Sequence, residues 1–134
     1  MATRRQVREA VVSLLYSYDL GNEDITKSVD MIFEDKKIRN AQKEYGKELL
    51  NGVMDSLEEV DVVVKDALNE RELSDIGSIE KAVLRLGAYE ITRNLADRAV
   101  IINEAVEISK LLGAENSAKF VNGVLDAINK EPTE

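Results

Sequence analysis

Residues 78–93 read SIEKAVLRLGAYEITR, and their apolar side chains do not keep to one side of a helical wheel. At about 100° per residue they cover most of the circumference, which is typical of a helix packed on several sides. These apolar positions are Ile79, Ala82, Val83, Leu84, Leu86, Gly87, Ala88 and Ile91. Ser78 stands where an N-cap is expected. We therefore predict a helix over 79–93 that lies at the centre of the fold.

The rest of the chain repeats apolar residues at three-to-four spacing, and no stretch alternates for long enough to compete as a strand. The sequence thus predicts an all-α protein. The other expected helices span 3–20, 25–37, 41–70, 100–112 and 117–129. Segment 41–70 is unusually long for a small domain, so we expect a kink near Gly52 or a break near Leu57. Asp97 is a candidate cap for the helix over 100–112.

Length and composition indicate one domain over 1–134, with approximate subdomains 1–72 and 73–130. The chain has a formal net charge of −8, one proline and 44% hydrophobic residues, which describes a well-solvated globular protein. Its apolar runs are far shorter than a membrane span, and no signal-peptide cleavage pattern follows the basic start. We expect a soluble, cytoplasmic protein that contacts no membrane.

The sequence contains neither histidine nor cysteine. It therefore lacks an imidazole base, a thiol nucleophile and the usual zinc ligands. Carboxylate pairs such as Glu104 and Glu107 fall on solvent-facing arcs without accompanying ligands, so we interpret them as solubilising charge. These features favour a binding protein that is not an enzyme and holds no cofactor or metal.

The first eight residues, MATRRQVR, carry three arginines and no acid. On the wheel of the first helix, Arg5 and Arg8 share a face with Tyr16 that the predicted core does not need. Arginine binds phosphate bidentately and tyrosine offers a stacking platform, so this face suits single-stranded RNA. The alternative is a solvated face with a tyrosine at a helix contact, and composition alone favours it. Arginine at a helix N-terminus interacts unfavourably with the helix dipole, which argues that these arginines have a role other than stabilising the helix.

Three further residues are candidates on weaker grounds. Glu80 falls on the polar sector of the central helix, where a surface charge is the simpler interpretation. Lys119 points outward from the last helix, and Phe120 lies at the edge of its apolar stripe, where a core role is the simpler one. Gly123 in the same helix indicates close helix packing, because glycine costs about 1 kcal/mol there relative to alanine.

Three stretches together resemble the NusB family of bacterial transcription antitermination factors. They are RRQVREAVVSLLYSYDL at 4–20, EKAVLRLGAYEI at 80–91 and INEAVEISKLLGAENSAKFVNGVLDAI at 102–128. The resemblance is collinear, and segment 22–75 matches in pattern and length alone. It implies two small three-helix bundles packed across each other. It also implies binding of the boxA element of nascent ribosomal RNA together with NusE, a small-subunit ribosomal protein, and assembly with other Nus factors on RNA polymerase.

The resemblance also assigns an RNA-binding role to particular positions. They are Arg4, Arg5, Arg8, Tyr16, Glu80, Lys119 and Phe120. Many relatives carry arginine where Gln6 stands, which should weaken phosphate affinity here. Asp97 replaces a proline and should affect only the connector, whereas Ala118 replaces a histidine and removes an RNA contact.

Two other functions stay open at this level. One is a helical protein-protein adaptor that does not bind RNA directly. The other is a detached relative of the NusB-like domain of RNA methyltransferases, although the chain is too short for the enzyme and lacks its cofactor loop and catalytic cysteine. The residues also do not decide between a monomer and a homodimer, and self-association through the arginine face would hide the RNA site.

Overall fold

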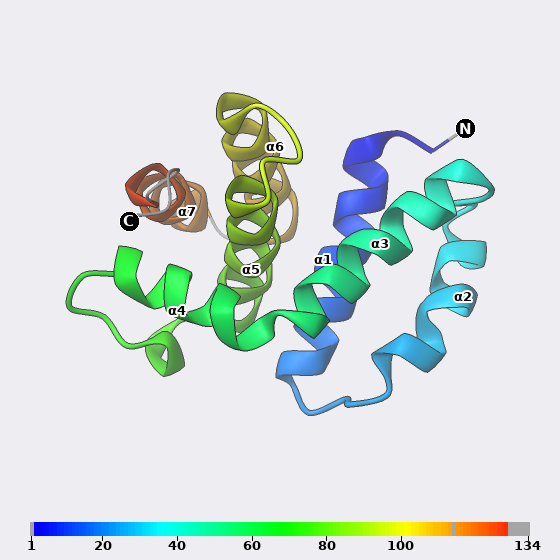
Figure 1. The fold of residues 1–134 in the computed structure, drawn as a ribbon, viewed down its shortest axis with the longest axis horizontal. Helices are drawn as coiled ribbons and strands as arrows, with labels where there is room; N and C mark the ends of the chain where they lie inside the picture. The colour runs from blue at the N-terminus through cyan, green and yellow to red at the C-terminus, as the bar shows by residue number, and fades with distance from the viewer. Residues whose placement is uncertain (1, 114, 129–134) are drawn as a thin grey trace.

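The computed structural model describes residues 2–113 and 115–128, and within these ranges the chain forms helices and no strand (Figure 1). This confirms the all-α prediction. The elements are α1 (Arg4–Asp19), α2 (Ile25–Asp35), α3 (Ala41–Asp55), α4 (Leu57–Ala67), the 3₁₀ turn η1 (Leu73–Asp75), α5 (Ser78–Thr92), α6 (Arg98–Leu112) and α7 (Glu115–Ala127). In the part of the chain so described, no helix combines the length and apolar character needed to cross a membrane.

Helix α5 occupies the centre, as its evenly apolar wheel predicts. It packs against α1 and α3 on one side and against α4, α6 and α7 on the other (Figure 1). Every residue from Ala82 to Ala88 is buried, including the charged Arg85. Helices α1, α2 and α3 form one bundle and α5, α6 and α7 the other, so α5 carries most of the contact between the two bundles.

The long segment 41–70 breaks at Ser56, which confirms the expected break near Leu57. Ser56 has φ −119° and ψ 26°, outside the helical range, and its hydroxyl donates to the carbonyl of Gly52 at 2.7 Å. After the break, α4 packs on α5 and α7. The buried residues of α4, Val60 and Val64, thus lie on a helix that packs mainly with the second bundle, and the approximate division after residue 72 stays a prediction.

Helix α1 begins with a complete capping box. The Thr3 hydroxyl accepts from the Gln6 amide at 3.1 Å, and the Gln6 side chain accepts from the Thr3 amide at 2.8 Å. Gly21, with φ +111°, follows its end as expected.

Of the two other expected N-caps, one stands at the predicted residue and one does not. Gly77, not Ser78, occupies the N-cap position of α5, and the Ser78 hydroxyl donates instead to Asp19 at 2.6 Å. Asp97 holds the N-cap position of α6 but makes no side-chain capping bond.

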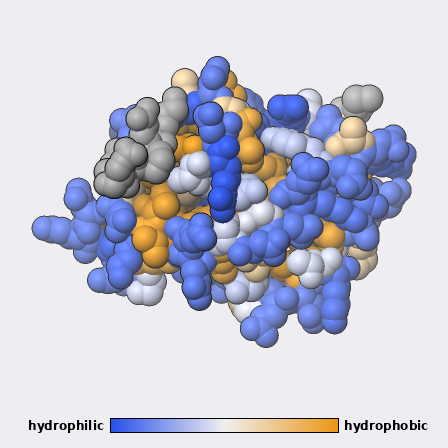
Figure 2. All heavy atoms as spheres, in the orientation of Figure 1, coloured by the Kyte–Doolittle hydropathy of each residue, from blue (hydrophilic) through white to orange (hydrophobic). Residues whose placement is uncertain are grey.

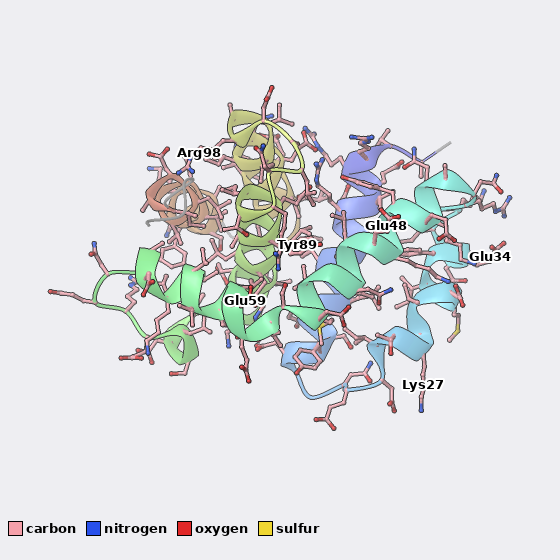
Figure 3. All side chains as sticks on the ribbon, viewed as in Figure 1. Lys27, Glu34, Glu48, Glu59, Tyr89 and Arg98 are labelled. Carbon is pink, nitrogen blue, oxygen red and sulfur yellow. The ribbon has the colours of Figure 1, made fainter. Side chains whose placement is uncertain are left out.

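Close helix packing occurs at glycines other than Gly123. Tyr89 of α5 lies against α3 at Gly52 (Figure 3), where a Cβ would collide with its hydroxyl. A Cβ on Gly87 would come within 2.9 Å of Leu125 on α7. Gly123 itself is exposed, with nothing within 4 Å of a Cβ, so its prediction as a packing residue is wrong. The interpretation failed because α7 turns this position to solvent.

Two glycine substitutions should change stability in opposite directions. In Gly46→Ala the new Cβ would lie 2.6 Å from Phe33 Cζ, and Phe33 is 0% exposed, so overpacking should cost about 1–3 kcal/mol. Gly123→Ala meets no atom within 4 Å and should gain up to about 1 kcal/mol from helix propensity. Urea unfolding monitored by circular dichroism measures both. Equal shifts in the two variants would contradict the packing at Gly46.

Candidate functional site

Helices α1 and α5 run antiparallel, and charged groups join them at both ends. Near the start of α1, Arg8 pairs with Glu90 of α5. At the end of α1, the Asp19 carboxylate accepts from Ser78 at 2.6 Å and from Lys81 at 3.1 Å, both near the start of α5. The predicted site residues fall into two groups, one near each of these ends.

Arg8 is buried and does not lie on a free face. It is 5% exposed and Glu90 is 2% exposed. Its Nε and Nη2 donate to the two Glu90 oxygens at 3.0 Å each. Burial alone would lower the pKa of Arg8, but the hydrogen bond and charge of Glu90 outweigh it and raise the pKa. The guanidinium is thus committed to a buried ion pair.

This corrects the interpretation of the Arg5, Arg8 and Tyr16 face as one that the core does not need. The wheel of α1 was divided into one core stripe and one free face, whereas α1 packs on its own bundle and also on α5. Val12, one turn after Arg8, is 0% exposed. An apolar residue in the middle of a polar face was the signal for this second contact.

Arg5 makes a more accessible ion pair with α6. Its Nε and Nη2 donate to the two Glu104 oxygens at 2.9 and 2.8 Å, with side-chain exposures of 44% for Arg5 and 16% for Glu104. The Arg5 hydrogen bond lowers the pKa of Glu104 against the opposing effect of burial. The interpretation of Glu104 as solubilising charge is therefore wrong. Arg5 keeps a large exposed surface that an anion can reach.

Arg4 is exposed, and its guanidinium carbon lies 4.9 Å from the centre of the Tyr45 ring on α3. Together with Arg5, Arg8, Val100 and Glu104 it lines an open hollow of about 450 Å³ between α1 and α6, here called the α1–α6 hollow. Of the three predicted arginines, Arg4 and Arg5 present charge at this hollow, whereas the charge of Arg8 is taken up by Glu90.

The other predicted residues gather at the opposite end of α5. Glu80 and Phe120 line a pocket of about 320 Å³ between α5, α7 and the loop before η1. The Ser117 hydroxyl donates to the Glu80 carboxylate, and the Arg71 guanidinium carbon lies 5.1 Å from the centre of the Phe120 ring. Lys119 is exposed on the same turn of α7. Reasoning from spacing missed Arg71 and Ser117, since neither is adjacent in sequence to its partner.

The structure therefore separates the seven predicted residues into two groups. Glu80 and Glu90 are ten residues apart on α5, which corresponds to roughly 15 Å along the helix axis. Tyr16 is half-buried, packs against the core and lies in the last turn of α1, toward the Glu80 end. Such a two-ended arrangement suits an extended polymer better than a single small molecule. Within the described ranges, no group of three or more potential metal-ligating side chains occurs.

The fold defines an all-helical protein in which two bundles meet along one central helix, α5 (Figure 1). Ion pairs join this helix to α1 at both of its ends. The sequence model described as the NusB family matches residues 5–130, so the chain belongs to that family.

Similar sequences cover almost the whole chain. It is 53% identical to the "Transcription antitermination protein NusB" of Aliarcobacter butzleri, over 97% of this chain and 99% of that protein. The protein of the same name from a Sulfurovum species is 54% identical over 97% of this chain and 100% of its own length.

Solved structures agree with the fold. A crystal structure of the antitermination factors NusB and NusE in complex with double-stranded RNA matches with a TM-score of 0.83 and 28% identity, over 92% of this chain and 93% of that one. A structure of NusB from T. maritima matches with a TM-score of 0.81 and 32% identity, over 93% and 89% of the two chains. These likenesses confirm the expected NusB-like helical fold.

The buried Arg8–Glu90 pair should dominate the stability of this end of the molecule. Arg8→Met leaves the Glu90 charge uncompensated and should cost about 3–5 kcal/mol of unfolding free energy. The double variant Arg8→Met with Glu90→Leu removes both charges and should recover most of that loss. Arg5→Met, which breaks an exposed pair, should cost far less. Denaturant unfolding of the four proteins tests this, and a single variant at Arg8 as stable as the one at Arg5 would contradict it.

Acid should weaken the connection at the other end of α1. Burial opposes ionisation of Asp19, but hydrogen bonds from Ser78 and Lys81 hold its pKa below the ordinary 3.8. A lowered folded-state pKa stabilises the protein above 3.8, and the contribution disappears as the pH falls toward the folded value. Asp19→Asn should therefore flatten the loss of stability below about pH 5. Asp35→Asn, at an exposed position, is the control, and an unchanged acid profile in Asp19→Asn would count against this role.

Proposed function

We propose that this chain is a transcription antitermination factor that binds RNA without a covalent step and acts together with a partner of the NusE type. The observation that carries the proposal is the match, over 92% of the chain, to a NusB that was crystallised with NusE and RNA. The RNA is proposed to be the boxA element of nascent transcripts, as the family resemblance implies. The proposal places the protein in the cytoplasm, in a complex with RNA polymerase and other Nus factors.

The exposed arginines support a phosphate-binding role at the start of α1. Arg5 is fixed by two hydrogen bonds to Glu104, so its fork is oriented before an anion arrives, and its side chain is still 44% exposed. Arg4 stands beside it at the α1–α6 hollow. We assign phosphate contacts to these two, whereas Arg8 is a positioning residue that acts through Glu90 and Glu104.

The opposite end of α5 supports contacts with bases and sugars. Phe120 offers a partly exposed ring beside Arg71, an arrangement on which a base can stack. Glu80, held by Ser117, can accept from a base edge. Tyr16 and Lys119 lie toward the same end of α5 and are proposed to add further contacts with the RNA. We propose that an extended RNA strand runs between the two ends.

Net charge supports a need for the partner. The protein has a formal net charge of −8, so its surface repels RNA except around Arg4 and Arg5. Binding without sequence preference should therefore be weak. The same acidic surface suits a basic ribosomal protein. Figure 2 shows hydrophilic residues over most of one face, especially over α2 and α3. Specificity for the RNA sequence should then depend on this chain and its NusE-type partner together.

Titration of boxA-containing and scrambled RNA, with and without NusE and at several salt concentrations, tests the proposal. We expect tighter binding of boxA, more so with NusE. Arg5→Gln should weaken binding and lower the magnitude of the salt slope by about 1, because one phosphate contact is lost. Lys65→Gln on α4 removes the same charge elsewhere and should leave the slope unchanged.

Two outcomes would contradict this proposal. If boxA shows no preference even with NusE present, the antitermination function fails. If NusE binds while neither RNA does, the chain is a protein-protein adaptor.

A further inference from the structure

The start of α1, the loop between α2 and α3, and the first turns of α3 line a third hollow of about 530 Å³, here called the α2–α3 pocket. The lining residues that matter here are Arg4, Lys37, Arg39, Asn40, Gln42 and Tyr45. None of the RNA-binding positions implied by the family resemblance, apart from Arg4, belongs to it. Its chemistry therefore needs its own explanation.

The charge of the α2–α3 pocket is positive in a protein that is acidic overall. Arg4, Lys37 and Arg39 supply three cations, and no carboxylate belongs to its lining. Glu34 lies at the outer edge of α2 (Figure 3) and pairs with Arg39 at 3.2 Å, with side chains 65% and 59% exposed. Such an exposed pair is weak, so Arg39 is available to a stronger anion.

The walls of the pocket are anchored by contacts with the body of the fold. Ile38, between the two basic loop residues, is 0% exposed and holds the loop against the core. The Gln42 side chain donates to the carbonyl of Ala2 at 2.8 Å and ties the start of α3 to the start of α1. The cations are thus presented on an anchored loop around the half-buried ring of Tyr45.

Arg4 belongs to both hollows, because it lines the α2–α3 pocket and the α1–α6 hollow. A strand that meets Arg5 in the α1–α6 hollow can therefore continue past Arg4 without leaving positively charged surface. Phosphate is an anion that Arg and Lys clusters bind through charge-assisted hydrogen bonds, and an aromatic ring beside them suits a base or a ribose, so the two features together favour a nucleotide.

We propose that the α2–α3 pocket is a second RNA subsite, which takes a nucleotide beyond the strand held by Arg5. Lys37 and Arg39 contact its phosphate, and the base or ribose packs near Tyr45 and Arg4. The subsite rests on the proposed RNA-binding function and extends it to residues that lie outside the seven predicted positions. Its consequence is that affinity depends on RNA length as well as on the recognised element.

The test compares a core boxA RNA with the same RNA extended by a few nucleotides at either end. The double variant Lys37→Gln with Arg39→Gln is measured beside a control double variant, Lys27→Gln with Lys65→Gln, which removes the same charge from exposed positions elsewhere. Wild type should bind one extended RNA more tightly and with a steeper salt dependence than the core. The pocket variant should lose about tenfold for that extended RNA and little for the core. The control should bind both RNAs like wild type.

Each contrary result has a distinct meaning. If wild type binds the core but gains nothing from either extension, or if the two double variants lose affinity equally, the subsite is overturned and the proposed function stands. If the pocket variant loses binding solely when NusE is present, and equally for both RNAs, the pocket contacts protein and the subsite is again overturned. If wild type binds no RNA at all, the proposed function fails and the subsite with it.

Discussion

The register of α1 against α5 is set by ion pairs at the two ends of the contact between these helices. Arg8 and Glu90 are both nearly inaccessible at one end, and at the other Asp19 meets Ser78 and Lys81. Sliding or rotating α1 would leave a buried charge unpaired, which costs far more than an imperfect apolar contact. The crossing of the two bundles therefore depends on these two ionic contacts, while the apolar residues between them provide most of the burial.

The same arrangement connects the interior to the surface. Arg8 lies within 4.0 Å of Glu104 as well as beside Glu90, and Glu104 in turn holds Arg5. Arg8, which the helical wheel places among surface residues, is thus buried, whereas the side chain of Arg5 stays 44% exposed. Three arginines close together in sequence consequently have three roles: a buried pair, an oriented fork and, at Arg4, a partner for an aromatic ring.

Helix extents and the central place of α5 could be predicted from the sequence, because apolar periodicity reports burial directly. The break near Leu57 could be predicted because segment 41–70 is unusually long for one helix in a small domain. Arg8 could not be placed, since a single wheel contains no information on a second packing partner, although buried Val12 was a clue. The α2–α3 pocket was missed for a related reason. Arg4 and Arg39 are distant in sequence and meet only through the packing of α1 on α3.

Position 6 illustrates how one side chain can serve one of two purposes. Gln6 closes the capping box of α1 with Thr3, so it supports the very turn that carries Arg4 and Arg5. An arginine at this position would add a cation beside Arg4 and Arg5 but could not accept the Thr3 amide hydrogen, because a guanidinium has no acceptor atom. Gln6 therefore gives this chain an ordered helix start at a position where an arginine would give positive charge.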